Sequence, residues 1–167
     1  AIGNLERKRG RFAVAEQYYI QAFETALEIA NERELAKTYY EMARLHQKIG
    51  DGEAAKINFQ KALQLFDQIG DSLKQGIVWL KIGIIERQMK NYDQSRVALD
   101  RALSIFRFRE SKVEEADALR ALAVLETDLG NYTRAHFYFN QSVSICIERN
   151  IPRRLAHLYV SLGMLEF

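Results

Sequence analysis

Apolar residues along this chain recur at the spacing of an amphipathic helix. Between Trp79 and Phe106, apolar or small residues stand three, four and seven positions apart, and the polar break Lys90–Tyr92 interrupts them. The sequence shows no sustained two-residue alternation of the kind typical of a strand. The pattern therefore predicts an all-α fold, with helices near residues 12–30, 33–49, 52–69, 73–89, 92–108, 113–129, 132–148 and 152–167.

The same pattern repeats every forty residues without a gap. A step of forty in either direction from Gly83 meets glycine or alanine each time, at Gly3, Ala43, Ala123 and Gly163. A second column holds large residues, Tyr39, Trp79, Leu119 and Tyr159, and a third holds small ones, Ala15, Ala55, Ser95 and Ala135. A fixed period of this length is the signature of a solenoid of stacked helix pairs.

The repeated motif resembles the tetratricopeptide repeat. Trp79, Ile82 and Gly83 match the first helix of that motif, and Gly130-Asn131-Tyr132 with Ala135 and Phe139 match the entry into its second helix. The resemblance implies a right-handed α–α superhelix, a single solenoid domain over residues 1–167, with repeats near 1–30, 31–70, 71–110, 111–150 and a partial one at 151–167. Both ends fall inside a repeat, so we expect a fragment of a longer array. The unit exceeds the usual length of about 34 residues, which predicts longer helices.

Charge and composition argue against several classes of function. The chain has 24 Lys and Arg against 22 Asp and Glu, a net charge of +2 that is too small to indicate a nucleic-acid partner. No apolar run approaches the roughly 18 residues of a membrane span, and no signal peptide opens the sequence. We therefore expect no membrane insertion and a cytoplasmic protein. The single cysteine, Cys146, cannot form an internal disulfide.

Residues able to carry catalysis or to bind a metal are scattered. The histidines fall in three different columns of the repeat, at His46, His136 and His157, and no catalytic or metal-binding motif is present. One column holds four glutamates, Glu6, Glu86, Glu126 and Glu166. They admit two interpretations, a row of catalytic acids or a structural ladder between adjoining repeats, and their regular recurrence favours the ladder. We predict no enzymatic activity, no cofactor and no metal.

The remaining face of each first helix carries the candidate binding residues. The resemblance implies that this face lines a concave groove for peptides. The groove is basic at first and apolar further on, and we assign to it Asn4, Arg7, Lys37, Tyr40, Arg44, Ile77, Leu80, Ile84, Arg87, Arg120 and Val124. Lys8, Gln47 and Lys48 extend its basic part. Arg44 is the expected anchor for a carboxylate, whereas Leu80 and Ile84 are expected to take apolar side chains.

These residues predict a non-catalytic module that holds an acidic, partly apolar peptide or protein segment. The carboxylate clamp of some family members is not matched: Asn4 fits it, but Glu41, Ile77 and Lys81 stand where asparagine, lysine and arginine are expected. Two alternatives stay open. The chain could be a self-assembly element that binds another copy through the groove or its truncated ends. It could also be a regulatory or sensor domain of a larger signalling protein or transcription factor.

Gly83 stands inside a predicted helix, where glycine costs roughly 1 kcal/mol relative to alanine. We expect the second helix of the pair to cross closest at this residue, so that a larger side chain would hold the two backbones apart. Replacement by leucine is then costly. Because alanine occupies the same column at residues 43 and 123, replacement of Gly83 by alanine is expected to be nearly neutral.

Overall fold

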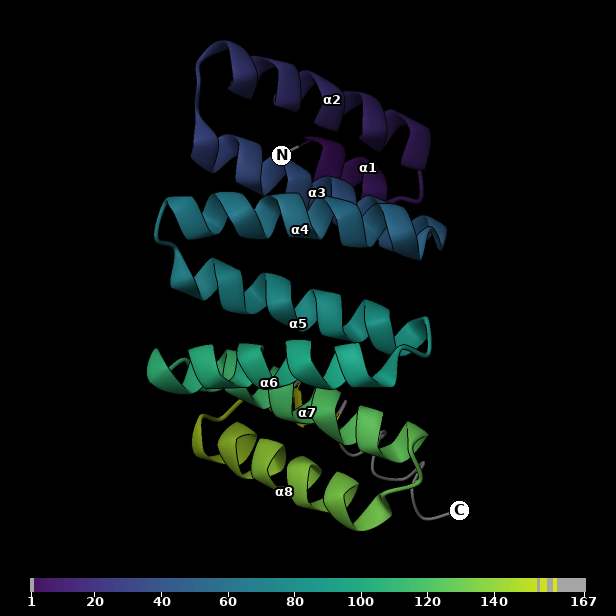
Figure 1. The fold of residues 1–167 in the computed structure, drawn as a ribbon, viewed down its shortest axis with the longest axis vertical. Coiled ribbons are helices and arrows are strands. Elements are labelled where there is room, and N and C mark those ends of the chain that lie inside the picture. The colour runs from purple at the N-terminus through teal and green to yellow at the C-terminus, as the bar shows by residue number, and fades with distance from the viewer. Residues whose placement is uncertain (1, 153, 156–157, 159–167) are drawn as a thin grey trace. The chain divides into compact units, whose positions relative to one another are not determined.

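Figure 1 shows the chain in the computed structural model, which describes residues 2–152, 154–155 and 158. The helices are α1 (Ile2–Lys8), α2 (Phe12–Glu28), α3 (Glu32–Ile49), α4 (Gly52–Gln68), α5 (Ser72–Gln88), α6 (Tyr92–Phe108), α7 (Lys112–Asp128) and α8 (Tyr132–Glu148). No strand occurs within these described residues, so the all-α prediction is confirmed. The predicted boundaries of α2 to α8 are correct to within two residues. The predicted helix at 152–167, which holds Glu166, lies largely outside the described part of the chain.

The contacts divide the chain into two compact units, Ala1–Lys81 and Ile82–Phe167, with the boundary inside α5. In the first unit α1 packs on α2, α2 on α3 and α3 on α4. In the second unit α6 packs on α7, and α7 packs on α8. Helices that follow one another in sequence are therefore neighbours in space, as in other repeat proteins.

The turns between the helices share one backbone conformation. A residue with positive φ occurs every twenty residues, at Gly10, Ala30, Gly50, Gly70, Lys90, Glu110, Gly130 and Asn150. The amide of the next residue donates to a carbonyl five positions earlier, as Asn131 N does to Glu126 O at 2.8 Å. This is the Schellman ending of a helix. Because each new helix begins within a few residues of that ending, the forty-residue register needs no gap.

Two glutamates of the repeated column accept side-chain hydrogen bonds within these turns. The Asn131 side-chain amide donates to Glu126 at 2.9 Å, and the Asn91 amide donates to Glu86 at 2.8 Å. The expected bond to an adjoining repeat is present at Glu126, which accepts a hydrogen bond from Arg96 of α6 at 2.7 Å. The bonds within each turn were not predicted. Glu126 therefore joins its own turn to the preceding helix.

Gly83 lies where α5 and α6 approach closely. A Cβ atom on Gly83 would lie 2.6 Å from Leu99 Cγ and 3.2 Å from Leu99 N. The Ser95 hydroxyl also donates to Gly83 O at 2.8 Å. The predicted close approach is confirmed. This crossing has no room for a methyl group unless Leu99 shifts, whereas the crossings at Ala43 and Ala123 hold one. The structure therefore predicts that Gly83→Ala is destabilising and not nearly neutral.

Each unit buries aligned columns of the repeat in a core of its own. The first has a cluster of Ala15, Tyr19 and Leu45, against which Phe12 and Met42 pack. The second has a cluster of Ala116, Ala123, Phe139, Cys146 and Leu158. Packing of these columns fixes how each first helix is rotated, and so determines which of its side chains remain available to line a site.

Candidate functional site

The first unit contains a pocket of about 530 Å³. Five of the residues assigned to the groove line it: Asn4 of α1, Lys37, Tyr40 and Arg44 of α3, and Ile77 of α5. The remaining lining residues were not assigned to the groove: Tyr19, Ala22, Glu34, Thr38, Glu41, Phe66 and Lys74. The structure therefore brings five of the predicted residues of this unit together in one pocket. The others, Arg7, Leu80 and the basic extension of Lys8, Gln47 and Lys48, do not line it.

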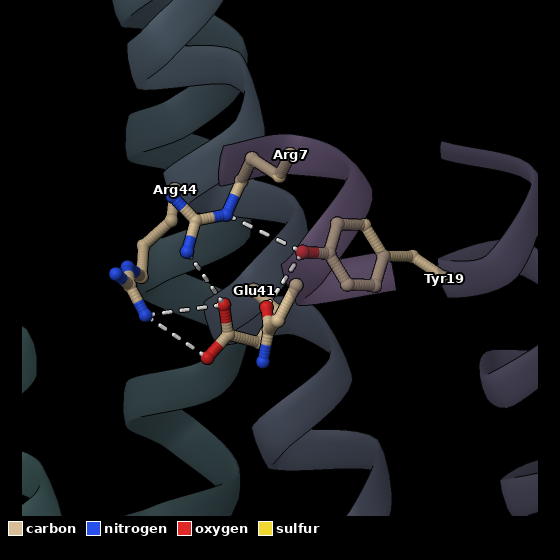
Figure 2. Close-up of polar contacts among 5 residues, drawn as sticks. Arg7, Tyr19, Glu41 and Arg44 are labelled. Carbon is tan, nitrogen blue, oxygen red and sulfur yellow. Dashed lines mark hydrogen bonds and ion pairs between the residues drawn. The ribbon is translucent and has the colours of Figure 1, made fainter. Parts of the chain in front are cut away.

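A polar network lies beside this pocket (Figure 2). Arg44 Nη1 donates to both carboxylate oxygens of Glu41, at 3.1 and 3.2 Å, and Arg7 Nη2 lies 3.7 Å from Glu41 Oε2. Arg7 Nε also donates to the Tyr19 hydroxyl at 3.4 Å, and that hydroxyl donates to Asn4 Oδ1 at 2.7 Å. The network ties α1, α2 and α3 together around the pocket.

Arg7 acts inside this network and not on the surface. Only 7% of the residue is exposed, and its guanidinium contacts Glu41 and Tyr19. Our assignment of Arg7 to the exposed lining is wrong, because α1 packs so that this side chain is covered. Arg7 forms an ion pair with Glu41, and this ion pair holds α1 against α3.

Tyr19 was missed from the sequence although a signal for it exists. Its column otherwise holds apolar residues, Phe59, Leu99 and Phe139, so a hydroxyl there is unusual. Burial raises the pKa of the Tyr19 phenol, against the lowering effect of the Arg7 hydrogen bond, so the hydroxyl stays protonated and donates at neutral pH. Gly3 makes room for the ring, because a Cβ atom there would lie 2.8 Å from Tyr19 Cε1.

The charges around the pocket are only partly balanced. Lys37 Nζ lies 2.6 Å from Glu34, and Arg44 is paired with Glu41 while its guanidinium stacks on Tyr40, 5.7 Å from the ring centre. Lys74 is exposed and has no ion-pair partner among residues 2–152, 154–155 and 158. The pocket therefore presents a surplus positive charge at Lys74. A second one lies beside it, because Arg7 and Arg44 share the single carboxylate of Glu41.

The predicted residues of the second unit line a smaller pocket of about 110 Å³. Ile84 and Arg87 come from α5, and Arg120 and Val124 from α7. Arg87 forms an ion pair with Asp128. Leu80, assigned to the same apolar stretch, lines neither pocket and is only 7% exposed. Its interpretation as an exposed apolar anchor is wrong, because the rotation of α5 buries it.

Catalytic and metal-binding candidates do not gather in the described part of the chain. No group of three His, Cys, Asp or Glu side chains there is placed to hold a metal ion. Cys146 is buried, and burial raises the pKa of its thiol, which does not favour a reactive thiolate. His157 lies outside the described residues. Among the described helices, none has the length and apolar character needed to cross a membrane.

The sequence profile of the tetratricopeptide repeat matches residues 1–68 and 74–148. This chain belongs to the tetratricopeptide repeat family. The match agrees with the helix pairs, the close crossing at Gly83 and the forty-residue register described above. Tetratricopeptide repeats typically form non-catalytic scaffolds for protein–protein interaction, so the family implies protein partners. No curated protein sequence gives a significant match to the chain.

Solved structures with the same fold come from several kinds of protein. BtubC from P. vanneervenii has a TM-score of 0.85 at 21% identity, with 98% of this chain and 68% of that chain covered. A signal transduction ATPase with a tetratricopeptide repeat sensor, from Pyrococcus horikoshii, also scores 0.85, at 22% identity over 94% of this chain and 24% of that one. A Rap protein complexed with competence and sporulation factor scores 0.80 at 21% identity, with coverages of 98% and 48%. The chain thus spans between about a quarter and two thirds of these proteins.

Proposed function

We propose that this chain is a non-catalytic protein-binding module whose first unit holds an acidic, partly apolar segment of a partner in the 530 Å³ pocket. The observation that carries the proposal is the surplus charge of Lys74 beside the half-buried side chains of Tyr40 and Ile77. A partner carboxylate would approach Lys74, and an adjoining apolar side chain would pack on Ile77 and Tyr40. Opposite charges favour the encounter, and apolar burial adds affinity.

The polar network supports this proposal by fixing the pocket in advance. Glu41 holds Arg44 from one side, and Tyr40 supports it from the other. Among the described residues, no buried side-chain nitrogen or oxygen lacks a hydrogen-bond partner. Binding to such a wall orders few side chains, so less affinity is lost to conformational entropy. The arginine therefore offers its remaining N–H groups to a ligand in a defined orientation.

The comparisons add support of a general kind. The same fold occurs in the tetratricopeptide repeat sensor of a signal transduction ATPase and in a Rap protein complexed with a factor. These parallels favour a regulatory or sensor domain of a larger signalling protein as the setting in which the module acts. They do not identify the partner, which we define by its chemistry.

The test begins with a pull-down from the source cell, followed by calorimetric titration of the captured partner at two salt concentrations. Lys74→Glu should weaken binding by about tenfold or more and reduce its dependence on salt, because a charge attraction becomes a repulsion. Ile77→Ala should weaken binding without altering the salt dependence. Lys48→Glu is the matched control, since Lys48, although assigned to the groove from the sequence, is an exposed lysine of α3 that does not line the pocket. Equal affinities for the Lys74 and Lys48 variants would refute the proposal.

A second candidate function is self-association. Ile2 and Leu5 of α1 are 54% and 46% exposed, whereas Leu45 and Ile85 in the column of Leu5 are each 1% exposed. The α1 helix of a second copy could cover this apolar face. Sedimentation equilibrium of the chain and of Leu5→Lys decides: a dimer that the lysine variant abolishes supports this function, and a monomer at millimolar concentration excludes it.

A further inference from the structure

Arg120 of α7 is a partly buried arginine that lines two pockets of the second unit. One is the pocket of about 110 Å³ that it shares with Ile84, Leu99 and Val124. The other, of about 190 Å³, also contains Asp117, Arg154 and Ser142. Arg120 therefore borders both pockets and brings a positive charge to each of them.

Asp117, which lines the larger of these pockets with Arg120, is already engaged by another arginine. Arg154 holds Asp117 bidentately, with Nε donating to Oδ1 at 3.0 Å and Nη2 donating to Oδ2 at 2.9 Å. Arg87, which lines the smaller pocket with Arg120, forms an ion pair with Asp128. Arg120 has no carboxylate partner within the part of the chain that the structure describes.

This arrangement leaves one positive charge without compensation in a mostly apolar pocket. The smaller pocket contains two arginines and no acidic residue among its lining side chains, and its other walls are Ile84, Leu99, Ala121 and Val124. Partial burial weakens the competition from water for the guanidinium, so a charge-assisted bond formed there is stronger than one at an exposed site. An acidic group on an apolar stem complements both features.

We propose that Arg120 recognises a glutamate of the partner segment, with the carboxylate on the guanidinium and the methylene groups against Ile84 and Val124. This inference rests on the proposed protein-binding function and names a second recognition point for it, separate from Lys74. One carboxylate matches the single unpaired charge. A phosphorylated side chain carries nearly twice that charge and would require a further free cation.

The test uses two pools of synthetic peptides, acetyl-X-X-Leu-Glu-Leu-X-X-amide and the same peptides with glutamine in place of glutamate, where X is a mixture of uncharged residues. Binding to the whole chain is measured by fluorescence anisotropy. The glutamate pool should bind about ten to a hundred times more tightly than the glutamine pool, the range expected of a partly buried charged hydrogen bond. Arg120→Gln should abolish this preference, and Arg120→Lys should retain part of it.

Arg109→Gln provides the matched control, because Arg109 is an exposed arginine of the same unit that lines neither pocket. It should keep the full preference for glutamate. In parallel, the side-chain Nε–H signal of Arg120, assigned in the parent chain through its bonds to the Arg120 backbone, should shift on addition of the glutamate pool. The NMR measurement keeps the proposal testable if either variant is unstable.

The proposal is overturned if Arg120→Gln retains the preference for glutamate, or if the Arg120 signal does not move while the peptides bind. It is also overturned if a phosphoserine pool binds through Arg120 more tightly than the glutamate pool. Failure of the proposed function looks different, because the natural partner would then be indifferent to Lys74→Glu whatever happens at Arg120.

Discussion

At the scale of single residues, Gly83 shows how one missing methyl group sets the distance between two helices. Its carbonyl accepts a hydrogen bond from Ser95, and Leu99 fills the space where a Cβ atom would stand. A helix gains up to about 1 kcal/mol when glycine becomes alanine. Here that gain is opposed by a contact far below van der Waals distance with Leu99 Cγ, an atom close to the backbone that cannot easily move.

Gly83→Ala should therefore destabilise the protein by about 1–2 kcal/mol, and Gly83→Leu should cost more, because overpacking outweighs helix propensity. Urea denaturation monitored by circular dichroism measures both. Ala123→Gly is the control at the equivalent crossing, where loss of a methyl group should cost about 0.5–1 kcal/mol. An alanine variant as stable as the parent chain would contradict this account.

Glu126 makes stability depend on pH. Burial alone would raise the pKa of its carboxyl group, but hydrogen bonds from Arg96 and Asn131 and the charges of Arg96 and Arg134 hold that pKa below its ordinary value. The unfolded chain therefore binds a proton at a higher pH than the folded chain does. Stability from this group is present above the unfolded carboxyl pKa and is lost as pH falls through the folded pKa.

Acidification from neutral pH through the carboxylate range should accordingly lower the thermal midpoint of the chain. Glu126→Gln should be less stable than the parent at pH 7 and should lose less on acidification, because the titrating group is gone. Thermal melts at a series of pH values provide the measurement. Parallel curves for parent and variant would show that Glu126 does not contribute to the acid sensitivity.

At the scale of helices and turns, half of the left-handed turn positions are filled by residues other than glycine. Lys90 has φ of +64° and takes the place that Gly130 takes one repeat later. A residue with a Cβ atom pays roughly 1–2 kcal/mol in this conformation, whereas glycine adopts it freely. Glycine at these four non-glycine positions would thus make the folded chain more stable.

Lys90→Gly should raise stability by about 0.5–1 kcal/mol, and Gly130→Ala should lower it by about the same amount. Both residues are exposed, so side-chain packing contributes little to either change. Differential scanning calorimetry of the two variants would show opposite shifts of the midpoint. Shifts of the same sign would mean that the backbone conformation is not what governs these positions.

The helices could be predicted from the sequence more fully than the candidate site. Apolar spacing and the forty-residue register fix where α2 to α8 begin and end, because both depend on order along the chain. The burial of Arg7 and the pairing of Arg44 with Glu41 depend on distances between helices and on side-chain rotamers. Leu80 illustrates the same limit, since a rotation of α5 by a fraction of a turn decides between groove and core. Residue type alone predicts neither the rotation of a helix nor the side-chain contacts that follow from it.

At the scale of the whole molecule, contacts between neighbouring helices carry most of the stability. In such a chain a core change should open the helices around it and leave distant ones protected. Phe59 and Phe139 offer a matched pair, because they occupy the same column, are buried, and belong to different units.

Phe139→Ala should cost about 3–5 kcal/mol locally and accelerate amide hydrogen exchange in α7 and α8, with α3 largely unaffected. Phe59→Ala should do the reverse, accelerating exchange in α3 and α4 and sparing α8. Exchange followed by mass spectrometry on peptides from each helix gives the result. Uniform acceleration along the chain in both variants would show that it opens as a single cooperative block.

The turns that recur every twenty residues also govern how this protein can change in length. A single residue inserted within a helix rotates everything after it by about 100°, which would carry Lys74 or Arg120 away from its pocket. A segment of forty residues, cut at two equivalent turns, can be duplicated or removed with the phase preserved. Evolutionary lengthening and engineered extension are thus both confined to whole cassettes of one helix pair.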